Sequence, residues 1–230
     1  MGARHSGSGR LTARLLRCGV AAGPVFIATF LVAGATRADY DPLRHPVSLL
    51  ALGPDGWVQV ANFLIAGVLS GAAAVGLARG PVAARTRVGP ILVGAAGLGL
   101  LGSGAFLTDP ISGYPPGTPD LLTSHSSTEA LLHDLAAIPV FLGLPAAALA
   151  YAWAFRRAGD RGWAAGSAAA GLAMLVGLVL TSAALAQTPT LVAFGGLLQR
   201  LTITTGLGWL TAVSARALAT TAAPTPAAGT

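Results

Sequence analysis

Charged residues are scarce in this chain of 230 amino acids. They make up 10% of it, against roughly a quarter in a typical soluble domain, whereas hydrophobic residues make up 53%. So few charges cannot cover the surface of a soluble body of this size. Because a helix needs about 20 apolar residues to span a bilayer, the length of the chain leaves room for about six spans and no second soluble domain.

Lysine is absent and cysteine occurs once. All 14 basic residues are arginines, and they give a net charge of +6. They lie between apolar runs instead of forming a patch with aromatic or polar neighbours, so we do not expect nucleic-acid binding. Cys18 has no second cysteine to pair with, which excludes an internal disulfide.

Six apolar stretches have the length that a bilayer core requires, and they predict an all-α bundle of six transmembrane helices. The predicted spans cover residues 19–36, 57–77, 88–107, 135–155, 163–186 and 194–213. The start of the last span is not fixed, because Gln199 and Arg200 interrupt the run from 191 to 213. The membrane domain is expected over 18–217, between a basic N-terminal segment (1–17) and a disordered Ala/Thr/Pro-rich tail (218–230).

The arginines predict the orientation of the bundle. Alternating connections place 11 arginines and one acid, Asp160, on one side of the membrane, and three arginines with seven acids on the other. The three are Arg37, Arg44 and Arg200, and the seven acids are Asp39, Asp41, Asp55, Asp109, Asp120, Glu129 and Asp134. The positive-inside rule then places both termini in the cytoplasm, and only an even number of spans gives this result. We expect a multi-pass protein of a bacterial plasma membrane.

Small and amphipathic residues suggest how the spans pack. Glycines four residues apart, Gly67 and Gly71, and a glycine series in the third span predict close helix contacts in lipid. Gln59 and Asn62 are expected to bond to neighbouring helices. The four tryptophans lie toward span ends and predict interfacial anchors: Trp57, Trp153, Trp163 and Trp209.

The two long external connections, residues 37–56 and 108–134, hold most of the other polar residues. We predict a polar pocket beneath them that binds a lipid headgroup or a small polar ligand, lined by Asp41, His45, Asp109, His133, Asp134 and Arg200. A charge within an apolar run normally faces a partner or a water-filled cavity. Arg200 is therefore expected to pair with an acid at the outer rim, Asp134 or Asp109 above all, and the alternative is that it snorkels to the interface.

A second pattern lies at the end of the second connection. His125, Glu129 and His133 are four residues apart in turn, so a helix would stack them on one face. Such a set could ligate zinc, or one histidine could act as a general base. The structural interpretation is a helix start capped by Thr123 or Ser124, with the histidines bonded to neighbouring loops.

Several strings resemble a bacterial family of membrane proteins known as domain of unknown function 998. The strings are Tyr40-Asp41-Pro42-Leu43-Arg44-His45-Pro46-Val47-Ser48, Asp109-Pro110 with Gly113-Tyr114-Pro115-Pro116-Gly117-Thr118, Leu132-His133-Asp134, and Gly196-Leu197-Leu198-Gln199-Arg200. The resemblance covers most of the chain from about Tyr40 to Trp209. It implies six spans, but no activity is established for the family, and any cofactor is unknown.

Three classes of function are therefore open. The first, which we favour, is a non-enzymatic membrane protein that binds a lipid or a small molecule. A small-solute transporter or channel would need a polar path across the membrane. A membrane-embedded, metal-dependent hydrolase would need a metal or a nucleophile–base pair, for which Ser48 near His45 is the only candidate nucleophile.

Overall fold

Long helices dominate the computed structural model, which describes residues 2–80, 86–120 and 127–222, with the backbone alone at residues 2–7 and 222. The long helices are α1 (Gly2–Thr36), α2 (Gly56–Arg79), α3 (Val88–Ala105), α4 (Thr128–Phe141), α5 (Gly143–Arg157), α6 (Arg161–Leu185) and α7 (Gly195–Ala222). Two short 3-10 helices, η1 (Val47–Ala51) and η3 (Val192–Phe194), lie in connections. The chain is thus an all-α bundle, as the sequence predicts.

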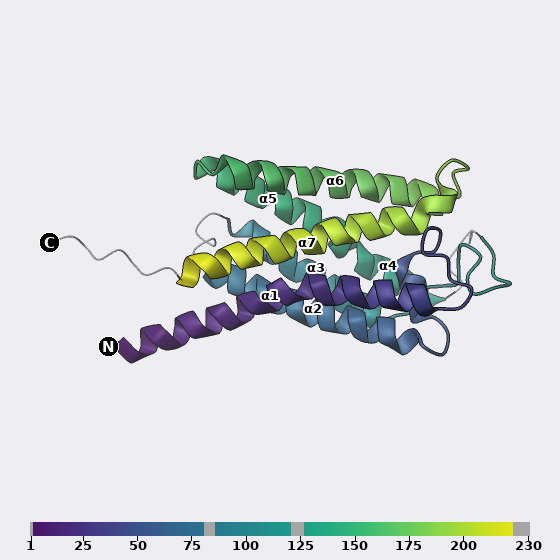
Figure 1. Ribbon diagram of the computed structural model, residues 1–230, viewed down its shortest axis with the longest axis horizontal. Coiled ribbons are helices and arrows are strands. Elements are labelled where there is room, and N and C mark those ends of the chain that lie inside the picture. The colour runs from purple at the N-terminus through teal and green to yellow at the C-terminus, as the bar shows by residue number, and fades with distance from the viewer. Residues whose placement is uncertain (1, 81–85, 121–126, 223–230) are drawn as a thin grey trace.

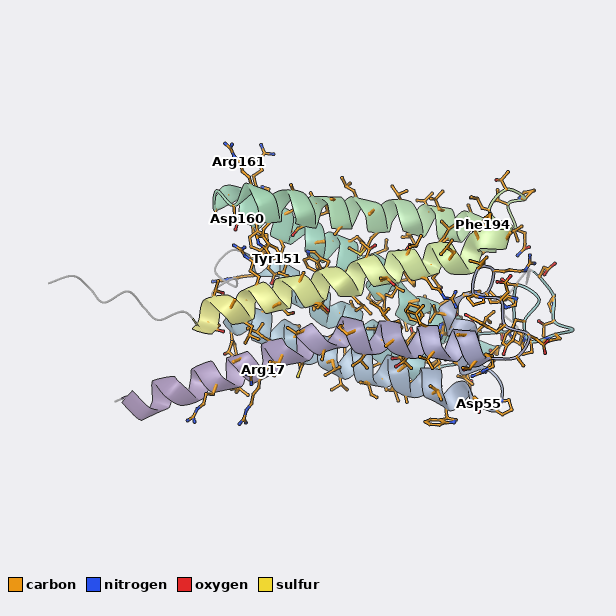
Figure 2. All side chains as sticks on the ribbon, viewed as in Figure 1. Arg17, Asp55, Tyr151, Asp160, Arg161 and Phe194 are labelled. Carbon is orange, nitrogen blue, oxygen red and sulfur yellow. The ribbon has the colours of Figure 1, made fainter. Side chains whose placement is uncertain are left out.

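The helices run side by side, and α1 begins at the same end of the bundle at which α7 finishes (Figure 1). We call this the terminal end, and the opposite end, which carries the longer connections, the loop end. In Figure 2, Asp160 and Arg161 lie at the terminal end and Asp55 and Phe194 at the loop end. Helix ends that carry arginine, such as Arg79 of α2 and Arg157 of α5, also face the terminal end.

Five helical segments are long and apolar enough to cross a membrane: Ser8–Thr36, Gly56–Arg79, Val88–Ala105, Thr128–Arg157 and Arg161–Leu185. The chain is therefore a multi-pass membrane protein. Helix α7 is not among the five, because its threonines, Gln199 and Arg200 lower its hydropathy. It nevertheless packs along α1 and α6, which supports its prediction as the sixth span.

The fourth span is broken in the middle. Helix α4 ends at Phe141 and α5 begins at Gly143, with prolines on either side at Pro139 and Pro145. Proline has no backbone N–H and cannot donate the helical hydrogen bond, so the span bends there. As a result α4 leans on α3, whereas α5 packs against both α3 and α6.

The spans form a closed ring in the order α1, α2, α3, α4/α5, α6, α7 and back to α1. Glycines set the tightest approaches in this ring. A Cβ added to Gly67 of α2 would lie 2.8 Å from the carbonyl oxygen of Gly97 of α3, and one added to Gly97 would lie 2.9 Å from the amide nitrogen of Gly71. The predicted close contact of the glycine-rich spans is confirmed.

Aromatic side chains fill the terminal half of the ring. Tyr151 and Phe155 of α5 are fully buried, and the Tyr151 and Trp209 ring centroids are 5.7 Å apart. Tyr151 lies inside the bundle in Figure 2. Arg216 of α7 pairs with Asp160, and its guanidinium lies 4.7 Å from the centre of the Trp163 ring. Large side chains therefore fill the centre of this half of the bundle.

The structure also corrects several sequence expectations. Trp57 and Trp153 are exposed, but Trp209 is 6% exposed and its Nε1 donates to Ser167 Oγ at 3.2 Å, so it is a core residue and not an interfacial anchor. Helix α1 extends through the basic segment 2–17, and α7 continues to Ala222, so residues 218–222 of the expected tail are helical. Residues 223–230 lie outside the described part of the chain.

Candidate functional site

A cavity of about 520 Å³ lies inside the ring, in the half nearer the loop end. Every long helix except α5 contributes to its lining, because α5 lies in the terminal half of the bundle. The helical residues that line it are Phe26, Phe63, Leu100, Ser103, Ala130, His133, Asp134, Ala137, Val140, Phe141, Leu178, Thr181, Ser182, Leu185, Gln199 and Ile203. Connections add Pro46, Val47, Ser48, Thr108, Asp109, Ile111 and Asp120. Its volume is typical of a small-molecule site.

The lining changes from polar to apolar with depth. Near the loop end it presents Ser48, Asp109 and Asp134, whereas Val140, Phe141 and Ile203 lie deeper. On α4 the step from Asp134 to Phe141 is seven residues, which is about 10 Å along the helix axis. The cavity therefore has a polar upper part and a hydrocarbon-like lower part.

His133 lines this cavity, and its ring is held in place by its neighbours. The residue is 5% exposed, and its Nδ1 lies 2.9 Å from the carbonyl oxygen of Phe106. A carbonyl only accepts, so Nδ1 carries a proton and donates this hydrogen bond. The Phe63 ring packs against the imidazole, with centroids 6.1 Å apart. This packing and the bond to Phe106 hold the ring in one orientation.

Three aspartates give the upper part a negative charge. Asp120 forms an ion pair with Arg44 at 2.7 Å, and Asp109 accepts a hydrogen bond from the Ser127 hydroxyl at 3.0 Å. Asp134 is exposed at the edge of the cavity. Neither arginine nor lysine is among the described residues that line the cavity, so its charged lining residues are carboxylates.

Arg200 holds in place the connection between α1 and α2, which forms the roof of the cavity. It is 7% exposed, and its Nη1 donates to the carbonyl oxygens of Pro42 (2.6 Å) and His45 (2.9 Å). Its Nη2 donates to the Tyr40 hydroxyl at 2.5 Å. These three acceptors are neutral oxygens of the first connection. The prediction that Arg200 pairs with the carboxylate of Asp134 or Asp109 is therefore wrong for these hydrogen bonds. The planar fork of arginine suits several acceptors at once, so Arg200 clamps α7 to that connection.

The string that follows Tyr40 folds into a compact turn above Arg200. The Asp41 carboxylate accepts from the Leu43 amide, and the Asp41 amide donates to His45 Nδ1, each at 2.9 Å. The rings of His45, Tyr40 and Tyr114 form a triangle, in which the His45 centroid lies 5.3 Å from that of Tyr40 and 5.2 Å from that of Tyr114. Burial lowers the pKa of His45 below 6.5 and raises the pKa of Tyr40 to about 12. Both side chains are therefore neutral near pH 7.

Further hydrogen bonds tie the roof to the helices. Gln199 Oε1 accepts from the Val47 amide at 2.7 Å, and the amides of Gly196 and Leu197 donate to the carbonyls of Arg44 and Leu43. Arg37 donates to the carbonyls of Leu50 and Leu52. The first connection is thus held by α7 on one side and by the end of α1 on the other.

The structure divides the six predicted pocket residues into two groups. Asp109, His133 and Asp134 line the cavity. Asp41, His45 and Arg200 do not line it and instead build its roof. Sequence reasoning missed Ser103, Thr181 and Ser182, because hydroxyl residues are common in transmembrane helices and give no positional signal without the fold.

The metal and nucleophile hypotheses gain no geometric support. Among the described residues, no group of three histidine, cysteine or acidic side chains is placed to hold a metal ion. His125, Thr123 and Ser124 lie outside the described residues, and α4 begins only at Thr128, capped by Ser127, whose hydroxyl accepts from the Ala130 amide at 3.0 Å. Ser48 lines the cavity, but His45 Nδ1 is taken by Asp41.

The fold and cavity define a helical membrane protein with a roofed, amphipathic cavity in one half of the bundle. The chain belongs to the family described as "Protein of unknown function (DUF998)", whose model matches residues 20–216. No curated protein and no solved structure matches the chain.

Proposed function

We propose that this protein binds a lipid headgroup or a small polar ligand in the cavity beneath the roof. The observation that carries the proposal is the lining: a cavity of about 520 Å³ with carboxylates and an imidazole above and hydrocarbon side chains below. Sites of this kind combine a mostly apolar wall with a few placed polar groups that orient the ligand. We further propose that the loop end faces the exterior of a bacterial plasma membrane, as the arginine distribution predicts.

The packing of the terminal half favours binding over conduction. A channel or transporter would extend the polar lining toward the terminal end, but the fully buried side chains there include the large side chains of Tyr151, Phe155, Leu207 and Leu210. A solute that entered the cavity would meet this packed aromatic and aliphatic layer. The cavity as it stands is accessible from one half of the bundle.

The test is native mass spectrometry of the protein released from its own membrane, in three forms. Ala137→Trp places a large side chain inside the cavity, whereas Leu135→Trp is the matched control, since Leu135 is 51% exposed on the same helix and does not line the cavity. We expect the wild type and Leu135→Trp to carry a co-purified small molecule or lipid that Ala137→Trp lacks. Identical spectra for the three forms, at equal thermal stability, would refute the proposal.

A further inference from the structure

One seam of the helix ring is open in the half that contains the cavity. Around the rest of the ring, neighbouring helices pack along their length, but the bent fourth span touches α6 mainly through α5. Near mid-membrane the seam is tight: a Cβ on Gly171 of α6 would lie 2.9 Å from Leu149 and 3.1 Å from the Pro145 carbonyl oxygen of α5. Beyond the break at Leu142, α4 barely touches α6.

Helix α4 is drawn away from α6 by its contact with α3. A Cβ on Gly99 of α3 would lie 2.5 Å from the carbonyl oxygen of Ala136, and one on Gly102 would lie 2.6 Å from the Ala136 Cβ. This backbone-to-backbone contact holds α4 on the α3 side. The two helices that flank the resulting gap both line the cavity, through Asp134, Ala137 and Phe141 on α4 and through Leu178, Ser182 and Leu185 on α6.

The gap opens toward the membrane and not toward the roof. Asp134 of α4 and Ser182 of α6 are exposed side chains that line the cavity, and they lie on the two helices that flank the gap, so they mark its lateral mouth. Over the described residues the roof is tied down by Arg200, Gln199 and Arg44. A ligand that moves through the lipid phase can therefore reach the cavity through its side.

The residues that line the upper part of the cavity indicate the chemistry of the ligand head group that can bind there. Around this part lie the carboxylates of Asp109, Asp120 and Asp134 and the imidazole of His133. The Thr181 hydroxyl, 5% exposed at the cavity wall, makes no hydrogen bond among the described residues. Carboxylates accept hydrogen bonds, and their negative charge favours a cation.

We propose that the occupant is an amphiphile with an amine-bearing head and a hydrocarbon tail, which enters from the membrane between α4 and α6. The head lies among Asp109, His133 and Asp134, and the tail follows Phe141, Leu178 and Ile203 toward mid-membrane. This inference rests on the proposed function, because it names the class of ligand and its route into the same cavity.

The test uses photolabelling of the full chain in lipid nanodiscs. The probes are a long-chain alkylamine with a diazirine in its chain and the fatty acid of the same length with the same diazirine. Ser182→Trp blocks the mouth and Ala137→Trp fills the cavity. Their controls are Val179→Trp, at a position that is 67% exposed on α6, and Leu135→Trp, and neither position lines the cavity. Ethanolamine, a head without a tail, is assayed separately by the thermal shift it produces.

We expect the amine probe to label peptides that contain Phe141, Leu178 or Ile203 about fivefold more than the fatty acid does. Labelling should fall about tenfold in Ser182→Trp and Ala137→Trp, a change of ~1.4 kcal/mol in binding, and stay unchanged in both controls. Asp134→Asn should lower the preference for the amine.

Four outcomes would overturn the inference. Equal labelling by the fatty acid would show that the head is not selected by charge, and unchanged labelling of Ser182→Trp would show that the lateral mouth is not the entrance. If ethanolamine stabilises the wild type but not Ala137→Trp while the alkylamine does not label the cavity, the amphiphile inference falls and the polar-ligand function stands. If neither probe binds and the purified protein carries no ligand, both proposals fail.

Discussion

Arg200 shows why a buried charge in a membrane helix can be structural. Each hydrogen bond from a charged donor to a neutral acceptor contributes about 1.5–3 kcal/mol, and Arg200 makes three, to Pro42, His45 and Tyr40. Its chain position predicts a partner, but not that the partners are backbone carbonyls of a connection more than 150 residues away.

We expect Arg200→Met to lower the free energy of unfolding by about 2–4 kcal/mol, because it leaves the buried carbonyls of Pro42 and His45 without their donor. Thermal unfolding in detergent measures the change. Arg156→Met is the control, since Arg156 is exposed in the last turn of α5, and it should unfold like the wild type. Equal unfolding of the two variants would contradict the clamp role of Arg200.

His45 should make the stability of the roof depend on pH. Burial lowers its folded-state pKa below the value of 6.5 expected in the unfolded chain. Below pH 6.5 the unfolded state therefore binds a proton that the folded state resists, and stability falls as the pH falls through that window. Above pH 6.5 both states are neutral at this residue and the effect disappears.

The measurement compares unfolding midpoints of the wild type and His45→Asn between pH 7.5 and pH 5.5. The asparagine amide oxygen keeps an acceptor for the Asp41 amide but does not titrate. Carboxylates contribute equally to both proteins, so the wild type should lose more stability on acidification than the variant. Parallel curves would exclude His45 as the titrating group.

At the scale of helices, the closest approach of α2 and α3 depends on the absence of side chains. Gly97→Val should prevent this packing, because its Cβ would lie 2.9 Å from the Gly71 amide nitrogen and 3.0 Å from the Gly67 carbonyl oxygen. Overpacking of this kind costs about 1–3 kcal/mol. The control is Gly71→Ala at the same interface, because its added Cβ meets no atom within 4 Å. Thermal unfolding should separate the two, and equal losses would contradict the packing argument.

Helix positions were the most predictable part of the fold, because hydropathy and length are local properties. The predicted spans 57–77 and 163–186 lie close to α2 and α6. The break at Leu142 and the lean of α4 toward α3 could not be predicted, because Pro139 alone is compatible with a continuous, kinked helix. The cavity depends on that break. The sequence therefore predicts some of the polar residues that line the cavity, but not the helix arrangement that encloses it.

At the scale of the whole molecule, the orientation of the bundle is the next prediction. In a Cys18→Ala background, Thr190→Cys lies beyond the end of α6 at the loop end, and Gly162→Cys lies in the first turn of α6 at the terminal end; both positions are exposed. A membrane-impermeant maleimide added to intact cells should label the cysteine at 190 and reach the one at 162 only after lysis. The reverse pattern would place the arginine-rich terminal end outside.

The clamp between α7 and the first connection also has a consequence for biosynthesis. Proteins are made from the N-terminus, so Tyr40 and His45 are in place long before Arg200 leaves the ribosome. Until then, α1 lacks its α7 neighbour and the carbonyls of Pro42 and His45 lack their donor. A nascent chain that ends after α6 would therefore expose a polar notch to lipid, which is a feature that membrane quality-control proteases could recognise. Insertion of α7 closes the helix ring and gives these carbonyls their donor, and the feature that a protease could recognise disappears.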